Sequence, residues 1–167
     1  MSSAQDRQVE TLSSEIKEKI DLWAERYPAD RRRSAVLMAL HYVQHDYGFL
    51  SRELMDAVAD HLSIPPIWVY EAATFYSMFH TSPVGRHEVA VCTNISCMLR
   101  GGEDLLRHIE NRLGIRAGES TSDGRIYLKK EEECLAACVG APMMMVDHHY
   151  YEDLTLERVN EIIDHLD

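Results

Sequence analysis

Apolar residues in the first 80 positions recur at intervals of three and four, which is the period of one face of an α-helix. Prolines, a glycine and serines interrupt this recurrence where helices commonly begin or end. The pattern predicts four helices: one from Leu12 to Tyr27, one over 36–47 that Gly48 ends, one that Ser51 caps, and one from Pro66 to about Tyr76. We therefore expect residues 1–80 to form a small helical bundle.

Beyond Pro83 the pattern changes to short apolar segments between glycine-containing turns. Apolar and polar residues alternate from His87 to Val91, as is typical of a strand. Further segments predict strands over 126–130 and 143–146, a hairpin partner over 150–152, and helices after Gly102 and Thr155. The chain is thus predicted to be α+β, with a helical domain over 1–80 and a second domain over 81–167. That second domain has the order strand, helix, strand, hairpin and helix.

Composition narrows the function without deciding it. The formal net charge of −11 argues against nucleic acid, whose phosphates require a basic face. No apolar run approaches the roughly 18 residues of a membrane span, so we expect no direct membrane insertion. The polar start does not resemble a secretory signal, and we expect a cytoplasmic protein.

The four cysteines form two tight pairs, Cys92 with Cys97 and Cys134 with Cys138, and 36 residues separate the pairs. A parallel strand–helix–strand crossover brings the loops that leave both strands to one edge of the sheet. We therefore expect all four thiols to meet there. Cytoplasmic thiols stay reduced, so metal ligation is a better interpretation than two disulfides.

Spacing alone leaves the identity of the metal centre open. Structural zinc usually takes its cysteines two residues apart, and neither pair has that spacing. Two loops that each give two thiolates suit a [2Fe–2S] cluster, which we favour over zinc. Thiol–disulfide catalysis is the weakest interpretation, because the chain has no C-x-x-C motif.

Five segments together strongly resemble the E-subunit family of bacterial NADH:quinone oxidoreductase, which is respiratory complex I. The equivalent diaphorase subunits of NAD-linked hydrogenases and formate dehydrogenases are similar. The likeness runs from about residue 12 to the C-terminus and rests on these segments: Ala72–Phe79, Pro83–Arg86, Cys92–Leu99, Glu133–Met143 and Tyr150–Thr155.

The resemblance implies a helical bundle followed by a thioredoxin-like ferredoxin domain that holds one [2Fe–2S] cluster. Its ligands would be the family's four cysteines, which match Cys92, Cys97, Cys134 and Cys138. The partner would be the F subunit, which carries FMN, a [4Fe–4S] cluster and the NADH site, within the peripheral arm of complex I. The protein would then be cytoplasmic and peripheral to the inner membrane, active in NADH dehydrogenation only as a subunit. The rival from another class is a zinc-stapled interaction module.

Four smaller features complete the expectations. Ala136 stands where the resembled family more often has glycine, and its methyl group could crowd the cysteine loop. The acidic run 131–133 before Cys134 is by default a solvated loop, but it would lower the potential of a nearby cluster if its charges are not screened. His41 and His45 have metal-binding spacing on a helix but are better explained as a solvated face. The segment 75–79 is either core or a partner surface, and its sequence favours neither.

Overall fold

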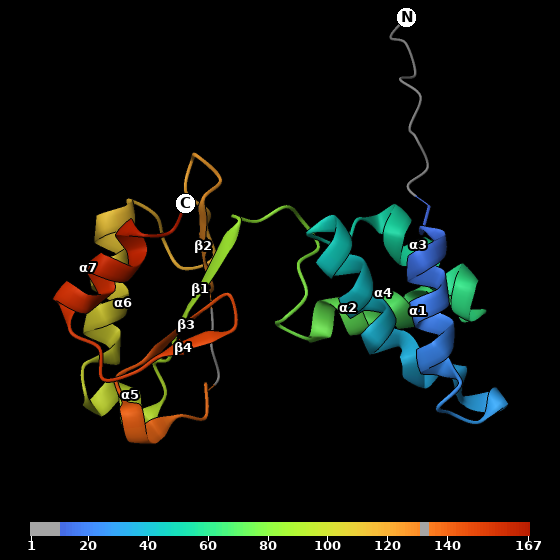
Figure 1. Ribbon diagram of the computed structural model, residues 1–167, viewed down its shortest axis with the longest axis horizontal. Coiled ribbons are helices and arrows are strands. Elements are labelled where there is room, and N and C mark those ends of the chain that lie inside the picture. The colour runs from blue at the N-terminus through green and yellow to red at the C-terminus, as the bar shows by residue number, and fades with distance from the viewer. Residues whose placement is uncertain (1–10, 131–133) are drawn as a thin grey trace, which may run out of the picture. The chain divides into compact units, whose positions relative to one another are not determined.

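The computed structural model describes residues 11–130 and 134–167, and the chain divides into two compact units, one ending at Pro83 and one beginning at Val84 (Figure 1). The first unit is helical in its described part. The second contains a mixed four-stranded sheet with helices. This arrangement confirms the predicted α+β class.

The four helices of the first unit lie where the sequence pattern predicts them, although α1 is shorter at both ends than the predicted range 12–27. Its elements are α1 (Ser14–Ala24), the 3-10 segment η1 (Ala29–Ala35), α2 (Val36–Tyr47), α3 (Arg52–Leu62) and α4 (Pro66–Phe75). Ser51 caps α3 by accepting a hydrogen bond from the Leu54 N–H at 3.1 Å. Gly48 ends α2 in the left-handed region at φ 82°, where glycine avoids the steric cost of a side chain.

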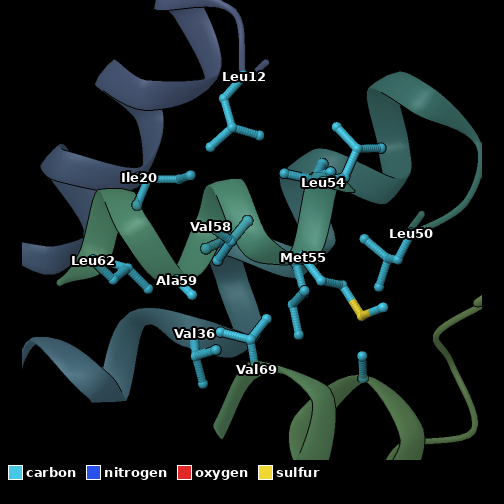
Figure 2. Packing of buried hydrophobic residues seen from close by; sticks show 14 of the residues in the cluster. Leu12, Ile20, Val36, Leu50, Leu54, Met55, Val58, Ala59, Leu62 and Val69 are labelled. Carbon is cyan, nitrogen blue, oxygen red and sulfur yellow. The ribbon is translucent and has the colours of Figure 1, made fainter. Parts of the chain in front are cut away.

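The core of the helical unit is built from the inward faces of these four helices (Figure 2). Ile16 and Ile20 of α1, Leu40 of α2 and Leu54 of α3 are almost fully buried, and each follows the three-or-four spacing seen in the sequence. Leu50 lies on the connection between α2 and α3, and its N–H donates to the His80 carbonyl at 2.8 Å. This hydrogen bond joins the C-terminal segment of the helical unit to the connection between α2 and α3.

The second unit is organised on a sheet of strand order β2-β1-β3-β4. Its elements are β1 (His87–Val91), α5 (Ile95–Leu99), α6 (Gly102–Leu113), β2 (Ile126–Leu128), the 3-10 turn η2 (Cys138–Gly140), β3 (Met144–Val146), β4 (His149–Tyr151) and α7 (Leu156–Asp164). β1 and β2 are parallel, whereas β3 is antiparallel to both β1 and β4. The helices α6 and α7 lie on the same face of this sheet (Figure 1), and their apolar side chains join one core with those of β1, β2 and β3.

Three details differ from the sequence expectations. The short helix α5, which contains Cys97, was not predicted. The hairpin partner begins at His149 rather than Tyr150, because Asp147 and His148 both adopt positive φ and form a two-residue turn by themselves. In the first unit, the residues before α2 form the 3-10 segment η1, which the pattern did not indicate, and Arg33 in it stacks on the ring of Trp68 at 4.1 Å.

The helices in the described part of the chain are too short or too polar to cross a membrane. None of them has both the length and the apolar character that a crossing requires.

Candidate metal centre

The parallel pairing of β1 with β2 places both cysteine loops at one edge of the sheet. His87 pairs with Ile126 and Val89 with Leu128, so the two strands run in the same direction. Cys92 follows the last residue of β1, and Cys134 and Cys138 lie in the connection from β2 to β3. This confirms the topological expectation that the two loops leave the sheet on the same side.

The first pair is part of the buried core of the second unit. Cys92 and Cys97 are each 2% exposed and pack with Leu135, Ala141 and Met143. The Cys92 N–H donates to the Met143 carbonyl at 3.2 Å and so extends the antiparallel ladder by one bond. Both sulfurs are therefore held by regular structure in an apolar environment.

A close backbone contact fixes the position of this first loop. Gly102 opens α6 so near the loop that a Cβ added to it would lie 2.7 Å from the Cys92 carbonyl oxygen and 3.0 Å from the Cys97 carbonyl. Both atoms belong to the backbone, so neither can move away by a side-chain rotation. The glycine is what allows α6 to lie against the cysteine loop.

The second pair lies in an exposed and irregular loop. Cys134 and Cys138 are both exposed, and Leu135 between them is buried among the first pair. Ala136 adopts a left-handed backbone at φ 58°, and its N–H donates to the Cys134 sulfur at 3.3 Å. A glycine would adopt this conformation without the steric cost that the alanine side chain carries, so backbone conformation matters at this position as well as crowding.

Hydrogen bonds and charge link the four thiols to one another. Burial acts to raise the pKa of Cys92, but backbone N–H groups of Leu135 and Asn94 and the thiols of Cys97 and Cys134 outweigh it and lower that pKa. Burial and the hydrogen bond to Cys92 raise the pKa of Cys97 to about 11, and Cys138 adds to this by its charge. Each of the other three thiols thus acts on the pKa of Cys92 or of Cys97, which is consistent with four thiols that lie near one another.

The donor set fits a sulfur-ligated cluster. Four thiols come from two loops at one sheet edge, the Ala136 amide donates to the Cys134 sulfur, and apolar side chains surround the buried pair. Thiolate ligands with amide donors and limited solvent are the features that bind and tune [2Fe–2S] clusters. Within 11–130 and 134–167, no three His, Cys, Asp or Glu side chains are arranged to hold a single metal ion.

The other sequence candidates have different outcomes. The acidic run 131–133 lies outside the described residues. His45 contacts the neighbouring Asp46 at 3.0 Å on an exposed face, in agreement with the expectation of a solvated helix surface. In the segment 75–79, Phe75 is 80% exposed whereas Phe79 is buried in the helical core. The segment is therefore surface at its start and core at its end.

Exposed apolar side chains on both cysteine loops were not foreseen from the sequence. Leu99 on α5 is 76% exposed and Val139 beside Cys138 is 98% exposed, and Ile95 and Met98 are also exposed. We call these four residues the apolar rim. A sequence signal existed, because Ile95, Met98 and Leu99 all lie within or just after the first cysteine pair. Their exposure depends on the short helix α5, which periodicity did not reveal.

The helical unit carries an open groove of about 750 Å³ between η1, the start of α2 and α4. Leu37, Trp68, Phe75 and Tyr76 give it an apolar lining, and Arg33 and Glu71 supply charge. Grooves of this kind accept side chains of ligands or partner proteins. The groove makes Phe75 a candidate contact residue rather than a misplaced core residue.

Comparison with known proteins places this geometry in context. Residues 20–167 match the family described as thioredoxin-like [2Fe-2S] ferredoxin. The chain is 44% identical over 149 residues to the E 2 subunit of NADH-quinone oxidoreductase from Rhizobium meliloti, covering 89% of this chain and 87% of that protein. It is 42% identical to the E subunit of NADH-quinone oxidoreductase from Rickettsia conorii, covering 84% of each chain.

A solved structure shows a similar fold. The air-oxidised NAD+-reducing [NiFe]-hydrogenase superimposes with a TM-score of 0.69 at 21% identity. The match covers 78% of this chain but 22% of the hydrogenase chain. At this identity the likeness supports the fold alone.

Proposed function

Because the chain belongs to the thioredoxin-like [2Fe-2S] ferredoxin family, we propose that it is the electron-transfer subunit of an NADH dehydrogenase. Its partner would be the F subunit, which would supply FMN and the NADH site. The observation that supports this proposal is the parallel pairing of β1 with β2, which places the loops of Cys92, Cys97, Cys134 and Cys138 at one sheet edge. A [2Fe–2S] cluster, when bound by these thiolates, accepts and releases one electron at a time.

The two cysteine pairs would contribute differently to holding such a cluster. Cys92 and Cys97 come from the buried core and fix the position of one side of the site. Cys134 and Cys138 are exposed and leave the other side accessible from outside. Ligation requires both pairs as thiolates, so binding releases protons that the apo chain holds, Cys97 included.

The surface around the thiols supports docking of a second protein. Leu99 and Val139 expose most of their apolar surface on the two loops that carry the ligands. Exposed apolar side chains that gather at one place commonly mark a protein interface. Electron exchange between two proteins weakens steeply with distance, so a partner must cover the site closely. The exposed side chains of the apolar rim would allow a partner to pack directly against the two cysteine loops.

The groove of the helical unit offers a second contact surface for the same partner. Phe75 and Trp68 are the large aromatic residues that dominate interface energies. Replacing Phe75 with serine removes an apolar contact without disturbing the core, since the side chain is 80% exposed. Leu22→Ser on α1 is the matched control, because Leu22 is also apolar and 60% exposed but lies outside the groove.

The test measures binding of the F subunit by calorimetry and NADH:ferricyanide activity in the mixture. Purified alone, the chain should bind no FMN and oxidise no NADH, because hydride transfer delivers two electrons together and requires a flavin. With the F subunit it should form a stable complex. Phe75→Ser should weaken that complex at least about tenfold, whereas Leu22→Ser should not. NADH oxidation by the isolated chain, or equal binding of both variants, would contradict the proposal.

The parent enzyme is a separate question. Relatives at 42% and 44% identity carry the name NADH-quinone oxidoreductase, which favours complex I over a hydrogenase or a formate dehydrogenase. We propose that the chain is held at the inner membrane through the other subunits of that complex. Recovery of the native protein from solubilised membranes with quinone reductase activity would support this, whereas recovery with hydrogenase or formate dehydrogenase activity would oppose it.

A further inference from the structure

A backbone amide in the second cysteine loop donates a hydrogen bond to a cysteine sulfur. The backbone of the residue before it, Leu135, acts to lower the pKa of Cys92, which belongs to the first pair. The Ala136 N–H donates to Cys134, which belongs to the second pair, at 3.3 Å. Backbone N–H groups that point at a negatively charged atom are a common means of stabilising an anion in proteins.

The backbone conformation of Ala136 directs its amide at the Cys134 sulfur. At φ 58° Ala136 occupies the left-handed region, which an alanine adopts at a steric cost and a glycine adopts freely. The buried side chain of Leu135 holds the preceding residue against the first cysteine pair. The loop therefore turns sharply at Ala136 while it remains anchored at Leu135, and strain in a well-anchored loop indicates a functional constraint.

An amide that donates to a ligand sulfur favours the more negative, reduced state of a cluster. Its positive end faces the sulfur, whose charge grows when an electron is added. An alanine at this position loses the turn more readily than a glycine does, so the bond depends on how well residue 136 tolerates positive φ.

From these observations we propose that Ala136 is a positioning residue, which holds its own N–H on the Cys134 sulfur and thereby raises the reduction potential of the cluster. The inference rests on the proposed function in one respect, namely that these sulfurs bind a [2Fe–2S] group. It predicts an effect that packing alone would not produce. Residues that tolerate positive φ should keep the potential, and residues that resist it should lower the potential.

The first arm of the test compares three variants of the full-length protein. Ala136→Gly and Ala136→Asn both accept a left-handed backbone and keep the N–H, so the midpoint potential should stay at the wild-type value. Ala136→Val is β-branched and resists positive φ, so the potential should fall. Ser63→Val is the matched control, because Ser63 also adopts positive φ, at 56°, but ends α3 in the helical unit. It should lower the melting temperature and leave the potential unchanged.

The second arm detects the bond directly and does not require Ala136→Val to assemble. Wild-type protein labelled with 15N-alanine should show a weak nitrogen hyperfine coupling in pulsed electron paramagnetic resonance of the reduced cluster. That coupling should vanish from 15N-alanine-labelled Ala136→Gly. It should reappear when the variant is labelled with 15N-glycine, as a coupling absent from wild-type protein labelled in the same way.

The outcomes separate this inference from the proposed function. Iron and acid-labile sulfide are measured first, and a wild-type chain that binds neither would overturn both. A bound cluster whose coupling survives Ala136→Gly in the alanine-labelled protein would overturn the role of Ala136 alone. A potential in Ala136→Val equal to that of the wild type would do the same. Loss of the coupling, together with a lower potential in Ala136→Val, would support it.

Discussion

The two cysteine loops differ in almost every structural respect, although each is expected to supply two ligands to one centre. The loop of Cys92 and Cys97 is buried, contains a helical turn and is confined by α6 through Gly102. The loop of Cys134 and Cys138 is exposed and turns at a left-handed alanine. The first cysteine pair is part of the buried core of the second unit, whereas the second cysteine pair is exposed at its surface.

This difference indicates that the first loop contributes mainly to the stability of the fold and the second mainly to the access of a partner protein to the site. A buried pair keeps its geometry whether or not a cluster is present, because the core holds it. An exposed pair gains order from the metal and leaves the site open toward a partner protein. If that division is correct, changes in the first loop should weaken the fold, and changes in the second should act mainly on the cluster and on docking.

The largest effect is expected from removing ligands. Cys92→Ser and Cys134→Ser should each lose the cluster, measured as iron and sulfide after anaerobic reconstitution. In the apo chain, Cys92→Ser should also lower the free energy of unfolding by about 1–3 kcal/mol, because a hydroxyl replaces a buried thiol. Cys134→Ser should change it by less than about 0.5 kcal/mol, because the side chain is exposed. Equal destabilisation by the two variants would contradict the claim that the first loop supports the fold more than the second.

The next effect concerns the backbone contact under the first loop. Gly102→Ala would bring a Cβ to 2.7 Å from the Cys92 carbonyl oxygen, so the loop or α6 must move. We expect destabilisation of about 1–3 kcal/mol in denaturant unfolding, together with weaker cluster retention.

Gly101→Ala is the control for this variant. Its added Cβ would meet no atom closer than 3.8 Å, although its positive φ of 91° carries a cost of about 1–2 kcal/mol. Both variants should therefore lose stability, but Gly102→Ala should lose the cluster faster on exposure to chelator. Identical rates of cluster loss would mean that the contact beneath Cys92 and Cys97 does not matter to the site.

The smallest effect on stability is expected at the apolar rim. Val139→Ser should change the free energy of unfolding by less than about 0.5 kcal/mol, since Val139 is 98% exposed. It should nevertheless weaken binding of the flavin-carrying subunit, as judged by calorimetry. Leu22→Ser is the control, because Leu22 is also apolar and exposed but lies on α1 of the helical unit, which carries neither cysteine loop. If the two variants bind alike, the rim is not the docking surface.

The sequence was most informative where structure is periodic. The spacing of Ile16, Ile20 and Leu54 indicated helices at α1 and α3, and Gly48 and Ser51 marked the end of α2 and the start of α3. Helix faces and caps are local properties, so they can be read without knowledge of the fold.

The site was only partly predictable, for a physical reason in each case. The parallel crossover and the cysteine spacing indicated the meeting of the four thiols. Helix α5 has five residues, which is too short for a periodic pattern. The one-residue shift of the last hairpin depends on the backbone of Asp147 and His148. Exposure of Val139 and burial of Leu135 in the same loop depend on packing between distant segments, which no local pattern encodes.

The most direct test of the central claim is the metal content of the four-cysteine site. After anaerobic reconstitution, the wild-type chain should contain about two iron and two sulfide per molecule and give an electron paramagnetic resonance signal when reduced. Each single replacement of Cys92, Cys97, Cys134 or Cys138 with alanine should abolish or destabilise that centre. A colourless protein that binds one zinc and no sulfide, or full iron and sulfide in Cys97→Ala or Cys138→Ala, would contradict the assignment.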